Sequence, residues 1–160
     1  MLDKKDLRIL KILMKNGRTK VRDIARTMKI PVTTVHKRIK NLENDRVILN
    51  YVANIDYEKL GYHILAFVLV KVNYIEIKKL KSNHDNLADR ILEKFPAVDR
   101  ASIITGPQRD ILLRIREKSV NDLNKFIHRL RDTPGVLETD TLLVLYDIEQ
   151  TGERRIDLLI

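Results

Sequence analysis

Apolar residues recur at helical spacing in three short segments at the start of the chain. The first segment begins at Asp3, which forms a capping-box pattern with Asp6, and it ends before Gly17. Thr19 is expected to cap a second short helix, and the third helix is expected at about 31–44. Three such helices, with a sharp turn between the second and the third, predict a helix-turn-helix.

The pattern changes after the third helix. The alternating, β-branched segment 47–56 predicts a short hairpin or wing, and Gly61 marks a break in a linker at 56–62. The segment 63–73 is a nearly continuous apolar strand, as expected where both faces are covered. The elements predicted after it are a helix at 76–95 with a polar interruption at 81–86, strands at 97–104 and 110–116, a helix at 119–130 started by Ser119, and a strand at 136–148.

The order β-α-β-β-α-β is that of a ferredoxin-like fold, in which both helices cover one face of an antiparallel sheet. We therefore expect an α+β chain with a winged helix-turn-helix domain at 1–50, a hinge at 51–62 and a ferredoxin-like domain at 63–148. The tail at 149–160 is polar and then apolar, and its pattern assigns it to no element.

Composition narrows the class of protein. The chain has 160 residues and no cysteine, which excludes disulfides, thiolate metal sites and cysteine nucleophiles. Its longest apolar run, 64–70, is far too short to span a bilayer, and its start lacks the apolar region of a secretory signal. We expect a cytoplasmic protein with no membrane partner.

The net charge of +9 is concentrated in the first domain. Residues 1–62 hold 15 Lys and Arg against 7 Asp and Glu, whereas residues 63–160 hold 16 against 15. A basic surface attracts polyanions through Coulomb forces and counterion release. The alternative, a solvated charged surface, becomes less favoured when the two halves are compared.

The outer face of the third predicted helix has the chemistry of a DNA-reading surface. Thr33 and Thr34 lie at its N-terminal end, where base edges are contacted, and Lys37 and Lys40 suit phosphates or guanine. Asn41 shares this face. The remaining candidate contacts are Arg18, Lys20 and Arg22 for the flanking backbone and Arg46 at the wing edge. Double-stranded DNA is the expected partner.

Catalytic chemistry finds little support in the sequence. The four histidines lie in separate elements without metal-ligand spacing, and no glycine-rich phosphate loop is present. We therefore expect no enzyme, no cofactor and no metal. Asp110, which follows the turn at 105–109, is the one acid at a place that a ligand would reach; the alternative is that it serves only as a residue of the turn or the strand end.

The chain resembles the Lrp/AsnC family, the leucine-responsive or feast/famine transcription regulators, over about residues 2–148. The matching features are Leu2-Asp3, Asp6, Ile9-Leu10, Gly17-Arg18, Ile24-Ala25, Thr34-Val35, Arg38-Ile39, Leu42-Glu43, Val47-Ile48, Leu60-Gly61-Tyr62, Thr105-Gly106, Asp110, Pro134-Gly135-Val136 and Thr141. The resemblance implies a winged helix-turn-helix, a hinge and a ligand-responsive ferredoxin-like domain. It also implies homodimers that pair through the second domain, and assemblies up to octamers or larger rings.

The resemblance further implies a small effector, usually an amino acid, bound between second domains. By position that site would be lined by Thr105, Gly106, Gln108, Arg109 and Asp110. This loop has one more residue between its glycine and its acid than most of the family. Arg46 stands where the family commonly has glycine, so the third helix ends without a left-handed glycine, or Asn44 takes that conformation.

The function expected from these features is sequence-specific regulation of transcription, modulated by the effector. One alternative is a non-specific architectural protein that compacts DNA through ring-like oligomers. Another is a sirohaem-decarboxylase-like enzyme on the same two-domain plan, which would carry a His/Arg-rich cluster in the second domain. There the histidines are His63, His84 and His128, each in a separate element.

Overall fold

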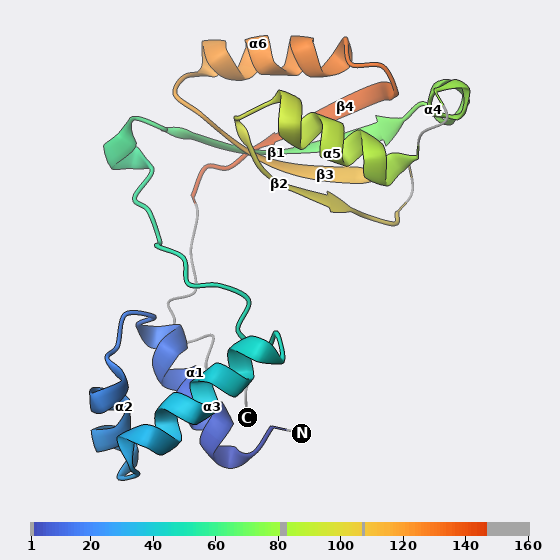
Figure 1. Ribbon diagram of the computed structural model, residues 1–160. Coiled ribbons are helices and arrows are strands. Elements are labelled where there is room, and N and C mark those ends of the chain that lie inside the picture. Colours follow the sequence, from blue (N-terminus) through green and yellow to red (C-terminus); the bar gives the residue numbers. More distant parts are fainter. Residues whose placement is uncertain (1, 81–82, 107, 147–160) are drawn as a thin grey trace. The chain divides into compact units, whose positions relative to one another are not determined.

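The computed structural model describes residues 2–80, 83–106 and 108–146. These residues form two compact units, one that runs to Asn54 and one that begins at Ile55. Figure 1 shows one unit made of helices and one unit built on a sheet. Within the described residues, no helix has both the length and the apolar composition to cross a bilayer.

Three helices make up the first unit: α1 (Lys4–Lys15), α2 (Val21–Met28) and α3 (Val32–Asn44). The Asp3 carboxylate accepts hydrogen bonds from the backbone N–H groups of Lys5 and Asp6, and Asp6 accepts in return from the N–H of Asp3. The predicted capping box is therefore confirmed. The three helices meet around a small core of Ile9, Ile24, Ala25, Met28, Val35 and Leu42.

Two expectations for this unit are wrong. Thr19 does not cap α2, because its hydroxyl donates to the carbonyl of Asn16 and Lys20 occupies the cap position without a side-chain hydrogen bond. The predicted hairpin at 47–56 is also absent, since the described chain contains no strand before β1. Ile48 of that segment packs against the core of the three helices, but Leu49 and Val52 are 80% and 81% exposed, so these two residues do not form a buried apolar face that would hold a hairpin together.

The end of α3 follows the first of the two alternatives drawn from the sequence, an end without a left-handed glycine. Arg46 itself adopts the left-handed conformation, with φ of 54°. Asn44 remains the last residue of the helix. The linker then continues to a short 3-10 turn at Glu58–Leu60, which Gly61 closes with φ of 83°.

The second unit is a four-stranded antiparallel sheet with strand order β2-β3-β1-β4. Its strands are β1 (Ile64–Val72), β2 (Val98–Ile103), β3 (Ile111–Glu117) and β4 (Val136–Leu143), and its helices are α4 (Tyr74–Lys79), α5 (His84–Lys94) and α6 (Val120–Arg131). This order is that of the ferredoxin-like fold, so the predicted fold class is confirmed. The predicted helix at 76–95 is divided into α4 and α5.

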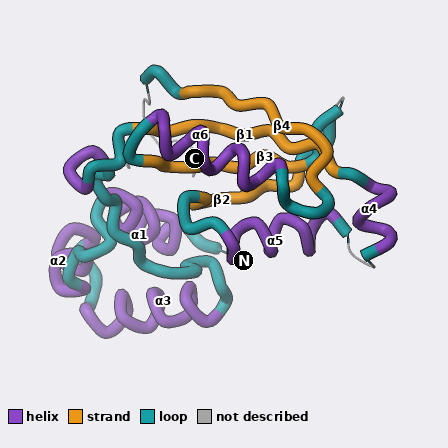
Figure 2. Tube along the Cα trace, turned by 90° about the horizontal axis from the view of Figure 1, so that it is seen from above, coloured by secondary structure: helices purple, strands orange, loops and turns teal. Residues whose placement is uncertain are grey.

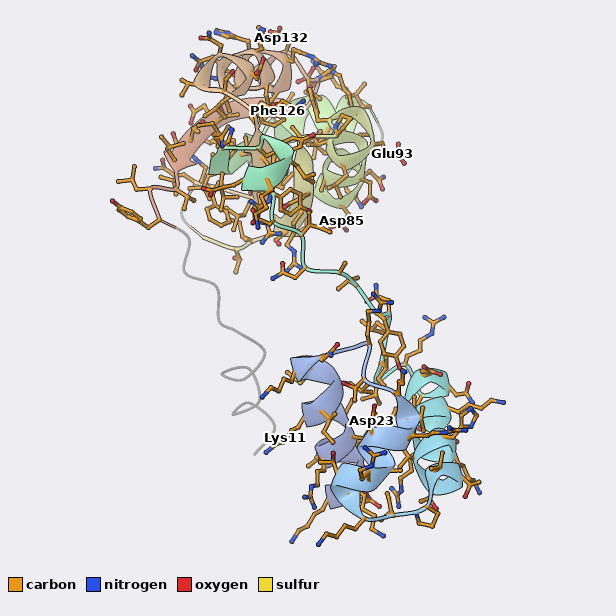
Figure 3. The ribbon with its side chains drawn as sticks, turned by 90° about the vertical axis from the view of Figure 1, so that its left-hand side faces the viewer. Lys11, Asp23, Asp85, Glu93, Phe126 and Asp132 are labelled. Atoms are coloured by element: carbon orange, nitrogen blue, oxygen red, sulfur yellow. The ribbon has the colours of Figure 1, made fainter. Side chains whose placement is uncertain are left out.

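Helices α5 and α6 cover the same face of the sheet (Figures 1 and 2). Phe126 of α6 points toward the sheet, whereas Glu93 of α5 points away from the domain (Figure 3). Phe126 meets Phe95 edge to face, with ring centroids 5.3 Å apart. Ala66, Val68, Val70 and Val72 of β1 are buried against these helices. On the other face Leu65 is buried, whereas Phe67, Leu69 and Lys71 are half-buried, so the described residues cover that face of β1 only in part.

Candidate functional site

The inner side of α3 anchors the predicted DNA-reading helix. Val35 and Leu42 are buried in the core of the first unit. Pro31 caps α3 without a side-chain hydrogen bond, and its carbonyl accepts from the N–H groups of Thr34 and Val35. Pro31 thus supplies a rigid start to α3 but no capping hydroxyl.

The outer side of α3 is exposed to solvent. Thr33, Lys37, Lys40 and Asn41 are exposed, and Thr34 is half-buried. The flanking candidates are exposed as well: Arg18 in the turn before α2, Lys20 at its cap, Arg22 in its first turn, and Arg46 just beyond α3. The nine predicted residues therefore lie on α2, on α3 or in the turns beside them.

An ion-pair cluster that the sequence analysis missed fixes α3 against α1. The Arg38 guanidinium lies 2.7 Å from a carboxylate oxygen of Asp6 and 2.7 Å from one of Asp3. Both carboxylates hold the pKa of Arg38 above its ordinary value, Asp6 having the larger effect. No local sequence signal pairs residues 32 positions apart, although Arg38 does belong to the residues that resemble the family.

In the second unit, the predicted effector loop joins β2 to β3. Thr105, Gly106 and Gln108 are exposed, whereas Arg109 and Asp110 are half-buried. Gln108 has φ of 74°, so this longer loop places one residue in the left-handed conformation.

Asp110 is held inside its own subunit. Its carboxylate accepts a hydrogen bond from the backbone N–H of Val72 at 2.8 Å and another from the Tyr74 hydroxyl at 2.6 Å. The hydrogen bond to Asp110 is the largest cause that raises the pKa of Tyr74 above its usual value, because ionisation would remove the donated proton. Tyr74 therefore belongs to this site, and the sequence analysis missed it.

Arg109 is likewise engaged within the subunit. Its guanidinium donates to Asp140 of β4 and also lies 3.5 Å from Glu138. Strand register explains this contact, because β4 pairs directly with β1 and its acids thereby come close to the loop. Asp140 and Glu138 also line a hollow of about 290 Å³ together with Arg131, Leu137 and Thr139.

A larger hollow of about 430 Å³ lies at the opposite end of the sheet, next to the linker residue Tyr62. None of the five predicted effector-lining residues lines either of these two hollows. Among the described residues, no group of three or more His, Asp or Glu is arranged to hold a metal ion.

Comparison with known proteins gives a match to each unit. A winged helix-turn-helix DNA-binding model matches residues 2–48, and the Lrp/AsnC ligand binding domain model matches residues 65–153. The HTH-type transcriptional regulator FL11 of Pyrococcus horikoshii is 36% identical over 152 residues, which are 95% of this chain and 95% of that protein. FL11 of Pyrococcus furiosus is 33% identical over 153 residues, 96% and 95% of the two chains.

Solved structures match the fold over nearly the full length. A transcriptional regulator of Neisseria meningitidis in complex with L-Met has a TM-score of 0.85 at 24% identity, and all of both chains is covered. A feast or famine regulatory protein of M. tuberculosis complexed with L-methionine has a TM-score of 0.82 at 25% identity, with 94% and 96% of the chains covered.

Proposed function

Because the chain belongs to the Lrp/AsnC family of transcriptional regulators, we propose that it recognises specific DNA sequences and that a small effector modulates it. The observation that carries this proposal is the outer face of α3. The inner side of α3 packs against a buried core, and Arg38 pairs it with α1. The outer side of α3 exposes hydroxyl, amide and cationic groups, an arrangement that suits a major groove. We further propose that the protein acts in the cytoplasm as a regulator and not as an enzyme, in line with the regulators to which it is similar.

Selection of bound fragments from random DNA tests sequence recognition. We expect enrichment of a pseudo-palindromic site whose half-sites lie one helical turn apart or a multiple of that, as a two-fold symmetric dimer requires. Footprinting of the enriched fragment is expected to show discrete protected half-sites. Uniform protection without enrichment would instead favour the architectural alternative.

Lys37→Ala is expected to weaken binding to every DNA sequence by a similar factor. If Lys37 meets one phosphate, the slope of log K against log salt becomes less negative by about 0.9. Thr34→Ala is expected instead to reduce the preference for the selected site over random DNA. Lys79→Ala, which removes an exposed cation from the second unit, is the charge-matched control and should leave the slope unchanged.

The effector that we propose is an amino acid. Two of the structural matches were determined as methionine complexes, and the loop at 105–110 combines an accessible glycine backbone with a carboxylate that retains free lone pairs. None of the five predicted residues lines either of the two hollows described above, and we propose that a second subunit completes the site. Repeating the DNA selection with a pool of amino acids tests this, because an effector changes the enriched spacing or the affinity.

The open face of the sheet supports self-association. Phe67 and Leu69 of β1 lie on this face with Leu112 of β3, and Phe67 pairs in register with Leu142 of β4, which is 54% exposed. Arg114, which pairs with Phe67, and Asp140, which pairs with Leu69, share this face, so its exposed apolar residues lie beside charged ones. Clustered exposed apolar residues are typical of an interface. We propose that two copies pair their sheets here to form a dimer, which can assemble further into octamers.

Leu142→Lys is therefore expected to shift the protein toward monomers in sedimentation analysis. The cause is the burial of an unpaired ammonium in the interface. Leu92→Lys places the same group on an exposed position of α5, on the helix-covered side, and should leave the assembly intact. If both variants sediment like the unchanged protein, another surface holds the dimer.

A further inference from the structure

Two cationic residues of the first unit adopt a backbone conformation that favours glycine. Lys29 has φ of 55° and ψ of 45°, and Arg46 has φ of 54°. Lys29 lies in the turn between α2 and α3, and Arg46 lies just after α3, so the two residues flank the DNA-reading helix in the sequence. Both side chains are exposed.

The same hydrogen-bond pattern closes both helices. After α2, the N–H of Ile30 donates to the carbonyl of Ala25 at 3.1 Å, and the N–H of Lys29 donates to that of Arg26. After α3, the N–H of Val47 donates to the carbonyl of Leu42 at 2.9 Å, and that of Arg46 donates to the carbonyl of Glu43. This is the Schellman motif, whose left-handed position is usually a glycine.

Glycine would make both closures with less strain. An L-residue at positive φ brings its Cβ close to its own backbone, and Lys and Arg have no short polar group that relieves this. A cation does interact favourably with a helix C-terminus, but salt screens that interaction at an exposed position. Within the described part of the chain, neither side chain forms an ion pair with a carboxylate. The helices themselves therefore give little reason for a cation at both positions.

We propose that Lys29 and Arg46 bind phosphates on the two DNA backbones that border the groove occupied by α3, and that their strained backbones are retained for this contact. The inference rests on the proposed DNA-binding function. The 13 residues of α3 span about 20 Å. The major groove is about 12 Å wide, so residues just beyond the two ends of the helix lie near its phosphate walls. On this geometry Lys29 is a further DNA contact beyond the nine predicted residues. Arg46 contacts a DNA phosphate from the end of α3 and not from the edge of a wing.

Glycine substitution tests the proposal because stability and DNA affinity should change in opposite directions. For Lys29→Gly and Arg46→Gly we expect the melting temperature of the first unit to rise by roughly 5 °C, as backbone strain is released. Affinity for the selected DNA site should fall roughly 3- to 10-fold for each residue, and each salt slope should become less negative by about 0.9. Lys29→Ala and Arg46→Ala should lose the same affinity without the gain in melting temperature.

The outcomes are separable. The unchanged protein and Lys79→Ala are expected to bind the selected site with the same affinity. If neither protein prefers that site to random DNA, the proposed function is rejected rather than this inference. Glycine variants that bind with unchanged affinity and salt slope would overturn the phosphate contacts. Glycine variants that melt at a lower temperature than the unchanged protein would show that the cations stabilise the helices, which also overturns the proposal.

Discussion

Gly135→Ala is expected to destabilise the second unit by about 3 kcal/mol, from a strained φ together with overpacking of the core. Gly135 has φ of 98°, and a Cβ at this position would lie 2.7 Å from Cγ2 of Ile77 and 3.3 Å from Cδ2 of Leu87. Both neighbours are buried and cannot move aside without displacing α4 or α5. Thermal unfolding followed by circular dichroism should show the transition of this unit lowered by roughly 15 °C.

Two other glycines separate the causes of this loss. Gly61 has φ of 83° and open space around it, so Gly61→Ala should show the cost of the backbone alone, about 1 kcal/mol. Gly106 also faces open space and has an ordinary φ, so Gly106→Ala should fall within about 0.5 kcal/mol of the unchanged protein. Equal melting temperatures for the Gly135 and Gly106 variants would contradict the predicted clash.

Arg38→Ala is expected to destabilise the first unit by about 2 kcal/mol, because it leaves the half-buried Asp6 carboxylate without its cation. The same change should weaken DNA binding at temperatures near the new transition, where α3 no longer keeps its place against α1. Arg26→Ala removes the same charge from an exposed position of α2, where the nearest carboxylate oxygen of Asp23 lies 3.6 Å away. That control should change stability by less than about 0.5 kcal/mol.

The acid side of the stability profile gives a second measure of this cluster. The backbone N–H of Asp6, and then the Arg38 guanidinium, hold the pKa of Asp3 below its usual value. The folded chain therefore binds a proton at Asp3 less readily than the unfolded chain does. This contribution to stability is present above the ordinary pKa of an aspartate and is lost as the pH falls through the lowered value. In Arg38→Ala the loss on acidification should be smaller, whereas an unchanged acid profile would contradict the role of Arg38.

Local features of the structure could be predicted because their partners lie close in the sequence. Asp3 with Asp6 and Ser119 with Asp122 are three residues apart, and both pairs form the expected helix caps. The three helices of the first unit and the strand order of the second likewise followed from apolar periodicity and the order of elements. Local spacing did not predict every cap correctly. The Thr19 hydroxyl could either cap α2 or donate to a nearby carbonyl, and it donates to the carbonyl of Asn16.

Contacts between distant segments could not be predicted in the same way. Arg109 meets Asp140 only because β4 pairs with β1 in a particular register. Tyr74 meets Asp110 where the central strand β1 ends and its neighbour β3 begins. The segment 47–56 has the alternating pattern of a hairpin, but none of the described residues covers Leu49 or Val52. A pattern identifies residues that are able to form a strand, whereas the strand itself requires a partner.

By itself the sequence determined the concentration of positive charge in the first unit, the helices that present it and the two-domain plan, since charge and periodicity are properties of neighbouring residues. Only the tertiary structure decided that Arg38 ties α3 to α1, that Arg109 and Asp110 are engaged within their own subunit, and that Lys29 and Arg46 occupy left-handed positions. The physical reason is that these features depend on how the chain closes its helices and pairs its strands. Side chains more than 30 residues apart then share one carboxylate or one guanidinium.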